Sequence, residues 1–253
     1  MNEFKVDKLN VKVMPDRNEM GKVAAADISE KIMELLSQKE EINMIFAAAP
    51  SQNDVLAHLL NYTDIPWNRI NAYHMDEYIG LLPEDKDKSF SCYLTDHIFG
   101  KVPFKSVNLI NSTATDAEAE CKRYAKLLTE NPTDIVVMGI GENGHIAFND
   151  PWVAKFDDTE VVKVVPLDDV CRQQQVNDGC FPSVDRVPKQ AITLTCPTLT
   201  NPKYQFCVVP AKTKAQAVKR TLNGDVSEEC PATILRKCDG ATLYLDADSS
   251  ELL

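Results

Sequence analysis

Glycine is scarce in this 253-residue chain, with 9 residues against the ~7% that is usual in proteins. No stretch approaches the ~18 uninterrupted apolar residues of a membrane-spanning helix. The first residues are charged and include no apolar core, so we expect no secretory signal peptide. Lys and Arg number 27 and Asp and Glu 38, and the net charge of −11 argues against nucleic-acid or anionic-membrane binding. An acidic chain that acts on an anion must concentrate its positive groups locally.

The sequence also lacks the usual cysteine motifs. Its eight cysteines include no pair separated by two residues, which excludes a Cys-x-x-Cys redox motif and a zinc knuckle. No group of His, Asp and Glu has metal-ligand spacing either, so we predict no metal. Cysteines without a secretion signal are typical of a reducing cytoplasm, and most are expected to be small buried residues.

Strand-like and helix-like patterns alternate along the chain. Residues 42–49 and 134–141 are continuous apolar runs, as expected of strands that are covered on both faces. In residues 16–37 the apolar positions recur at helical spacing. A capping box of Thr115 and Glu118 predicts where another helix begins. We expect strands at 4–14, 42–49, 70–75, 106–111, 134–141, 191–195, 204–209 and 241–247, and helices at 16–37, 55–60, 117–128 and 211–223, the last ended by Gly224.

This alternation, without linker or repeat, predicts one domain over residues 1–253. The fold class is α/β, a single doubly wound, mostly parallel, Rossmann-like sheet with helices on both faces. Ligands of such sheets bind beyond the carboxyl ends of the strands, often where the strand order reverses. The loops after the strands are therefore the places to search for a site.

A third of the glycines fall in one loop after a buried strand: Gly139, Gly141 and Gly144. Glycines there permit a tight turn and let backbone N–H groups approach a ligand. The loop is not a dinucleotide fingerprint, because a histidine follows at once and no clear helix opens after it. His145 lies between Asn143 and Asp150, which can fix its tautomer and tune its basicity. The alternative is a structural histidine in a turn.

Two further segments carry candidate groups. Asp76 and Glu77 follow a predicted strand, and because side chains alternate along a strand they cannot both face one cleft. One of them is a candidate general base, and the alternative is a solvated acidic loop. Lys214 lies in the first turn of a predicted helix, where free N–H groups and a lysine form an anion site. The alternative there is a solvated lysine.

Together these segments resemble the glucosamine-6-phosphate deaminase/isomerase family, with the 6-phosphogluconolactonases more distantly similar. Five segments match in order from about residue 40 to the end of the chain. The continuation Gly-His-Ile-Ala-Phe-Asn favours the deaminases over the lactonases, which usually have a Thr-Ala-Ser-Leu-Phe-Pro type sequence there. The matching segments are 71–81 (NAYHMDEYIGL), 139–151 (GIGENGHIAFNDP), 187–193 (VPKQAIT), 211–217 (AKTKAQA) and 231–235 (PATIL).

The resemblance implies conversion of an amino-sugar phosphate to a ketose 6-phosphate and ammonia, without cofactor or metal. It implies that Asp76 is the C2 base and that His145 opens the sugar ring, with Asn143 and Asp150 as its neighbours. Lys214 matches a phosphate ligand. The remaining substrate-binding residues that we expect are Ser51, Gln52, Glu77, Gly139, Gly141, Gly144 and Arg172.

Several positions depart from the family pattern. The early phosphate loop, usually a Thr-Gly-Ser/Gly-Thr type sequence, reads Ala49-Pro-Ser-Gln52. Asp150 stands where the family usually has Glu, and Asn143 where some members have Asp. Arg172 is the nearest candidate for the family's phosphate arginine. These changes favour a divergent enzyme with altered sugar preference over an inactive one.

Two other functions remain open at this stage. One is a 6-phosphogluconolactonase-type hydrolase, and the other is a non-catalytic sugar-phosphate sensor, although no basic recognition helix is present for DNA. We expect the protein to be cytoplasmic and to bind a small sugar phosphate. The oligomeric state stays open, and a homo-oligomer is one alternative. The resemblance does not distinguish glucosamine from galactosamine.

Overall fold

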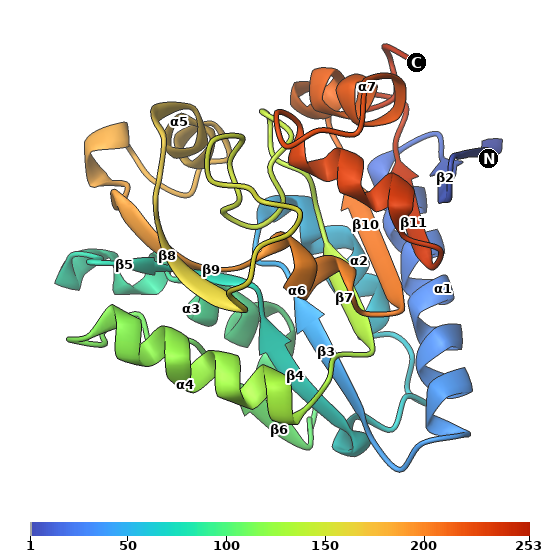
Figure 1. The fold of residues 1–253 in the computed structure, drawn as a ribbon. Coiled ribbons are helices and arrows are strands. Elements are labelled where there is room, and N and C mark those ends of the chain that lie inside the picture. Colours follow the sequence, from blue (N-terminus) through green and yellow to red (C-terminus); the bar gives the residue numbers. More distant parts are fainter. Residues whose placement is uncertain (1) are drawn as a thin grey trace.

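The computed structural model describes residues 2–253, which form an eight-stranded sheet and a smaller three-stranded sheet. The large sheet has the order β1-β2-β11-β10-β7-β3-β4-β6, and all its pairs are parallel except β1 with β2 (Figure 1). Its strands are β1 (Asn2–Val6), β2 (Leu9–Val13), β3 (Ile42–Phe46), β4 (Ile70–His74), β6 (Ser106–Asn108), β7 (Ile135–Met138), β10 (Tyr204–Val209) and β11 (Ala241–Leu245).

Helices cover both faces of this sheet, so the predicted α/β fold class is confirmed. In β3 the side chains of Met44 and Phe46 enter one core, whereas Ile45 enters the other. The first core is shared with α1 and α2, and the second with α4 and α7, as period-two alternation requires. The helices are α1 (Arg17–Leu36), α2 (Asn53–Leu59), α3 (Phe90–Leu94), α4 (Ala117–Glu130), α5 (Asp169–Asn177), α6 (Cys196–Thr200) and α7 (Ala215–Asn223).

Some sequence expectations were wrong in detail. The strand expected at 4–14 is a hairpin, because the chain turns at Asp7, which has a φ of 50°. The N-cap of α4 is Asp116 rather than Thr115: its carboxylate accepts the Ala119 N–H at 3.0 Å. Gly224 caps α7 with a φ of −81°, so it ends the helix without the left-handed conformation.

The second sheet was not expected from the sequence. It has the order β5-β9-β8, from β5 (Asp76–Ile79), β9 (Gln190–Leu194) and β8 (Val162–Pro166), and both its pairs are antiparallel. It is joined to the large sheet through β4, since the Leu194 N–H donates to the Met75 carbonyl at 2.8 Å. The chain passes directly from β4 into β5, so Asp76 is held by the junction of the two sheets.

The order of the large sheet reverses at β3. From β3 the chain adds β4 and β6 on one side, and then β7, β10 and β11 on the other. The loops that follow β3 and β7 therefore run in opposite directions from the carboxyl ends of these neighbouring strands. A crevice is left between the two loops, as in other doubly wound sheets. Among residues 2–253, no helix combines the length and the apolarity that crossing a membrane demands.

Candidate active site

A pocket lies at the carboxyl ends of β3, β4, β7 and β10, where the strand order reverses. The structure brings to its wall seven residues that the sequence predicted: Ser51, Gln52, Asp76, Gly139, Gly141, His145 and Lys214. Two others, Asn143 and Asp150, contact His145. Gly144, Glu77 and Arg172 do not line the pocket.

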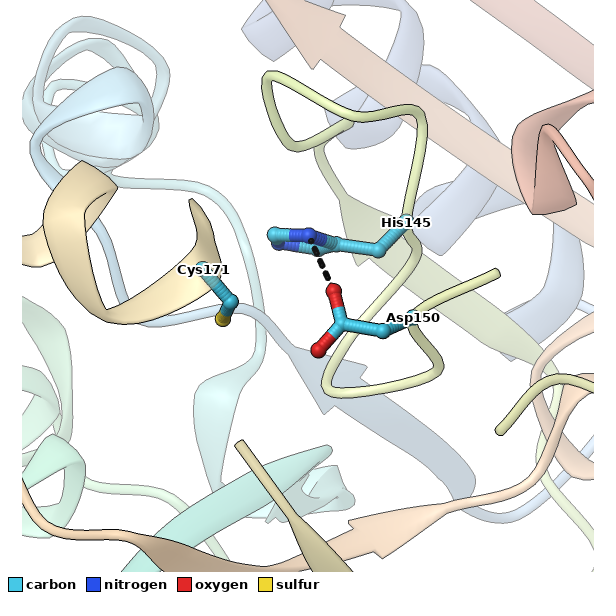
Figure 2. A group of neighbouring side chains, drawn as sticks. All are labelled: His145, Asp150 and Cys171. Carbon is cyan, nitrogen blue, oxygen red and sulfur yellow. Dashed lines mark ion pairs between the residues drawn. The ribbon is translucent and has the colours of Figure 1, made fainter. Parts of the chain in front are cut away.

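The imidazole of His145 is held from one side by two oxygen atoms. Its Nδ1 lies 3.1 Å from Asp150 Oδ1 (Figure 2). The same Nδ1 lies 2.8 Å from Asn143 Oδ1, and Asn143 Nδ2 donates to Asp150 Oδ1 at 2.8 Å. Both nearest atoms are acceptors, so Nδ1 carries the proton and Nε2 is left as the basic nitrogen. Burial alone would raise the pKa of Asp150, but the hydrogen bonds from His145 and Asn143 lower it below its ordinary value.

Two glycines shape the loop around this histidine. A Cβ on Gly141 would lie 2.1–2.4 Å from three atoms of the His145 ring, so only glycine permits the ring to occupy its place. Gly144 has a φ of +92°, and a Cβ there would lie 2.5 Å from Cys230 Sγ. Gly144 thus shapes the turn, although it was predicted to bind substrate.

Asp76 faces the pocket from the first position of β5. Its side chain is buried, and its carboxylate accepts no hydrogen bond from residues 2–253. Burial raises the pKa of Asp76 well above its ordinary value, and the nearby Glu77 carboxylate raises it further. Such a carboxyl group is a strong proton acceptor whenever it is ionised.

Glu77 corrects a sequence prediction, because its side chain points away from the pocket. Its carboxylate accepts the N–H groups of Tyr78, Phe90 and Ser91 at 2.9–3.0 Å, which satisfies the amino end of α3. The residue is fully buried. Glu77 therefore fixes the position of α3 against β5, and Phe90 of that helix is part of the pocket wall.

Lys214 brings a positive charge to the pocket from the residue before α7. It is only 4% exposed, and its ammonium has no hydrogen bond or ion pair within residues 2–253. Burial lowers the pKa of Lys214, although Asp178 and Glu142 oppose this shift. An unpaired cation in a pocket of an acidic protein is a binding group for an anion.

The loop after β3 lies on the same wall. Gln52 Nε2 donates to the Val208 carbonyl at 3.2 Å and to Ser51 Oγ at 3.1 Å, while Gln52 Oε1 is buried without a partner. A Cβ on Gly139 would lie 3.0 Å from Gln52 Nε2. The Gln52 amide therefore packs against Gly139 and ties the loop after β3 to β10.

The backbone just before Lys214 is strained. Ala211 has φ and ψ of 81° and 147°, a conformation that is essentially restricted to glycine. Its N–H donates to both oxygens of the buried Asp246 carboxylate, at 3.2 and 3.0 Å. Asp246 is itself held by the backbone N–H of Ser249 at 2.7 Å. The segment after β11 therefore holds the loop that presents Lys214.

We expect the substitution Ala211→Gly to stabilise the fold. The strained alanine costs about 1–3 kcal/mol, and the extra backbone entropy of glycine offsets about 0.5–1 kcal/mol of the relief. The free energy of unfolding, measured with urea, should rise by about 1 kcal/mol. The matched control is Ala215→Gly in α7, which should lower it by about 1 kcal/mol. If the free energy of unfolding falls in both variants, the backbone at Ala211 is not strained.

Arg172 is the second correction. Its guanidinium donates to the carbonyl oxygens of Val184 and Val187, and so it holds the following loop instead of a ligand. The same helix, α5, supplies Gln174 and Gln175 to the pocket wall, with Asp178 just beyond it. The Tyr78 hydroxyl donates to Gln175 Oε1 at 2.7 Å. The only signal for these residues was the glutamine run beside Arg172.

The fold and the pocket define an α/β enzyme with a buried carboxylate, an oriented histidine and one lysine at a switch point. A sequence profile of the glucosamine-6-phosphate isomerases/6-phosphogluconolactonase family matches residues 15–244, and the chain belongs to this family. The predicted resemblance is therefore confirmed.

Individual relatives agree with this membership. The chain is 36% identical to a glucosamine-6-phosphate deaminase of Listeria monocytogenes over 228 residues, which cover 89% of this chain and 95% of that protein. It is 34% identical to a Bacillus cereus deaminase, over 87% of this chain and 82% of the relative.

Solved structures give the same result. A monomeric glucosamine-6-phosphate deaminase superposes with a TM-score of 0.85 at 30% identity, covering 96% of this chain and 99% of the other. The 6-phosphogluconolactonase of Thermotoga maritima superposes with a TM-score of 0.73 at 21% identity, over 93% and 98% of the two chains. The second similarity concerns the fold alone.

Proposed function

We propose that this protein is a glucosamine-6-phosphate deaminase, which converts the amino-sugar phosphate and water to a ketose 6-phosphate and ammonia. The observation that carries the proposal is the meeting of Asp76, His145 and Lys214 in one pocket, from three separate loops. These are the base, the ring-opening group and the anion ligand that this reaction requires. The named deaminases that the chain resembles support the same assignment.

The first step of the proposed reaction opens the sugar ring. The Nε2 atom of His145 removes the proton of the C1 hydroxyl and returns a proton to the ring oxygen, so the C1–O5 bond breaks and an aldehyde forms. The Asp150 carboxylate stabilises the imidazolium that forms in between, since it lies 3.1 Å from Nδ1. Asn143 keeps the ring in orientation.

The second step moves a proton from C2 to C1. The Asp76 carboxylate removes the C2 proton while a proton of the substrate's ammonium group passes to O1, which gives an enolamine. Asp76 then delivers its proton to C1, and an iminium remains at C2. Water adds to this carbon, and the C2–N bond breaks to release ammonia. The electrons move within the substrate, so none of these steps transfers an electron to a cofactor.

Lys214 is proposed as the phosphate ligand, and the exposed Lys212 offers a matched control. We expect Lys214→Met to raise KM roughly 10–100-fold, because a hydrogen bond to a charged group contributes about 1.5–3 kcal/mol. Lys212 pairs with Glu251 at 2.9 Å, and 74% of its side chain is exposed. Lys212→Met should therefore leave KM unchanged. Steady-state ammonia release measures both, and equal KM values for the two variants would remove Lys214 from the phosphate site.

The assignment is tested with a small panel of substrates. Purified protein is incubated with glucosamine 6-phosphate, galactosamine 6-phosphate or 6-phosphogluconolactone, and ammonia, ketose and acid are assayed. We expect equal amounts of ammonia and ketose from an amino sugar. Lactone hydrolysis without any ammonia would refute the deaminase assignment, and tight binding without turnover would indicate a sensor.

We infer that the protein acts in the reducing cytoplasm, a view supported by its eight free thiols. The expectation of a homo-oligomer stays open to test. Every residue that we assign to the reaction comes from one chain, and the structural relative is described as monomeric. Light scattering of the active protein, with and without substrate, determines the state that turns over.

A further inference from the structure

Three buried side chains with metal-binding atoms meet behind the pocket wall: His145, Asp150 and Cys171 (Figure 2). One nitrogen, one carboxylate oxygen and one sulfur atom all lie within 4.8 Å of one another. Cys171 belongs to the first turn of α5 and does not line the pocket. Because the three residues are separated in sequence, their spacing gave no sign of this cluster.

The Asp150 carboxylate supplies the second observation. One of its oxygens, Oδ1, is bound by Asn143 Nδ2 and lies near His145 Nδ1, whereas Oδ2 is buried without any hydrogen-bond partner in residues 2–253. Asp150 has no exposed surface. Figure 2 shows that Oδ2 points toward the side of Cys171. An unsatisfied buried carboxylate oxygen is costly, and a cation between these atoms would satisfy it.

The surrounding charges favour a cation. The carboxylates of Asp168 and Asp76 act on Cys171 together with that of Asp150, and among the charged groups that act on this thiol within residues 2–253 Lys214 alone is positive. These carboxylates attract a divalent cation, which displaces the thiol proton on binding.

We propose that His145 Nδ1, Asp150 and Cys171 Sγ form a binding site for a thiophilic divalent cation, with Zn²⁺ as the best fit. Nitrogen, oxygen and sulfur ligands are the set that Zn²⁺ prefers, at about 2.0–2.3 Å. Neighbouring ligands of a tetrahedral zinc are then about 3.3–3.6 Å apart. His145 Nδ1 and Asp150 Oδ1 already approach that spacing at 3.1 Å. Asn143 Oδ1, which lies 2.8 Å from Nδ1, is a ready fourth donor.

Zinc at this site is a reversible inhibitor and not a cofactor. Binding releases one proton, from Sγ, and moves the imidazole proton from Nδ1 to Nε2, so Nε2 is no longer basic. The Nδ1–H group and the Asp150 carboxylate are then no longer available to stabilise an imidazolium. This consequence rests on the proposed ring-opening role of His145, whereas the binding itself does not.

Binding is tested first with Co²⁺, which needs no substrate. The whole protein is titrated with Co²⁺ while the thiolate-to-cobalt charge-transfer absorption is recorded, and Zn²⁺ is then added to displace it. We expect the band in the wild type and in Cys92→Ala, a control at a thiol in α3. Cys171→Ala should lack the band and bind Zn²⁺ at least about 10–100-fold more weakly. Circular dichroism verifies that the variant folds, and Cys171→Ser replaces it if the alanine variant does not.

Activity gives the second readout. Zn²⁺ should inhibit ammonia release by the wild type, EDTA should restore it, and the folded Cys171 variant should resist inhibition by at least about 10-fold. No charge-transfer band in the wild type, or the same band in the Cys171 variant, overturns the site. A wild-type band together with a protein that never deaminates would leave the site standing and refute the proposed function.

Discussion

Asp76→Asn should nearly abolish ammonia release and at the same time make the protein harder to unfold. Loss of the proton-transfer base should lower kcat roughly 10²–10⁴-fold. The side chain accepts no hydrogen bond from residues 2–253, and burial makes its charge unfavourable, so a neutral amide of the same shape costs less. Thermal and urea unfolding should both show a higher midpoint. Unchanged ammonia release would remove Asp76 from catalysis.

Glu77→Gln is the matched control, because it makes the same chemical change one residue further on. Its Oε1 accepts the Tyr78 and Phe90 N–H groups and its Oε2 accepts that of Ser91, so in the amide an NH2 group would face the Ser91 N–H and one hydrogen bond to a charged group, worth about 1.5–3 kcal/mol, would be lost. This variant should unfold at a lower urea concentration than the wild type. Opposite shifts in stability for the two variants separate a catalytic carboxylate from a structural one.

The raised pKa of Asp76 also predicts the pH dependence of activity. The proposed base must be ionised, so kcat/KM should fall as the pH drops through this raised pKa, well above the range of an ordinary carboxyl group. The folded state holds the Asp76 proton more tightly than the unfolded state does. Asp76 therefore destabilises the fold. This cost is full above its folded pKa, decreases as the pH falls through that pKa, and vanishes only below the ordinary carboxyl pKa of the unfolded state. Asp76→Asn should remove this contribution from a stability-against-pH profile.

We expect Gly141→Ala to cause the second large loss of turnover, because the new methyl group displaces His145. The new methyl group would overlap the imidazole at 2.1–2.4 Å, so the ring must leave its contacts with Asn143 and Asp150. Misplacement of a catalytic group by about 1 Å can reduce turnover 10²-fold. We expect a loss of at least that order with the cyclic substrate, and a milder defect with substrate supplied in open-chain form.

Gly139→Ala provides a graded comparison in the same loop. Its methyl group would meet Gln52 Nε2 at 3.0 Å, a contact that a flexible side chain relieves. Its turnover should stay much closer to that of the wild type. Equal losses for the two variants, or equal losses of Gly141→Ala on both substrate forms, would contradict the ring-opening role of His145.

Most of the large sheet could be predicted from apolar runs in the sequence, because the central strands β3, β4, β7 and β10 are buried on both faces. β10 begins and ends where the pattern said, at Tyr204 and Val209. The small sheet was missed because its antiparallel partner strands are far apart in sequence. Asp76 pairs with Thr193, for example, and no local pattern relates these residues.

The residues of the candidate site also fall into two groups, those that the sequence placed in the pocket and those that only the structure places. Asp76, His145 and Lys214 follow strands whose ends meet, so sequence order and chemistry were enough to place them together. Arg172 has a charge that suits a phosphate site and Glu77 has a carboxylate that suits acid–base chemistry, yet both make hydrogen bonds to backbone groups instead. Gln174 and Gln175 were missed because a polar run on a short helix has the appearance of a solvated face. Only the packing of α5 against the pocket reveals their position.

The hydrogen bonds from the Ala211 N–H to the Asp246 carboxylate have a consequence for the order in which the site forms during synthesis. Asp246 lies 35 residues after Ala211 in the chain, so it leaves the ribosome later than the bend that it holds. The loops that carry Asp76 and His145 emerge far earlier. A nascent chain can therefore expose Asp76 and His145 before Asp246 fixes the loop of Lys214, so the anion ligand is positioned after the two acid–base residues have emerged.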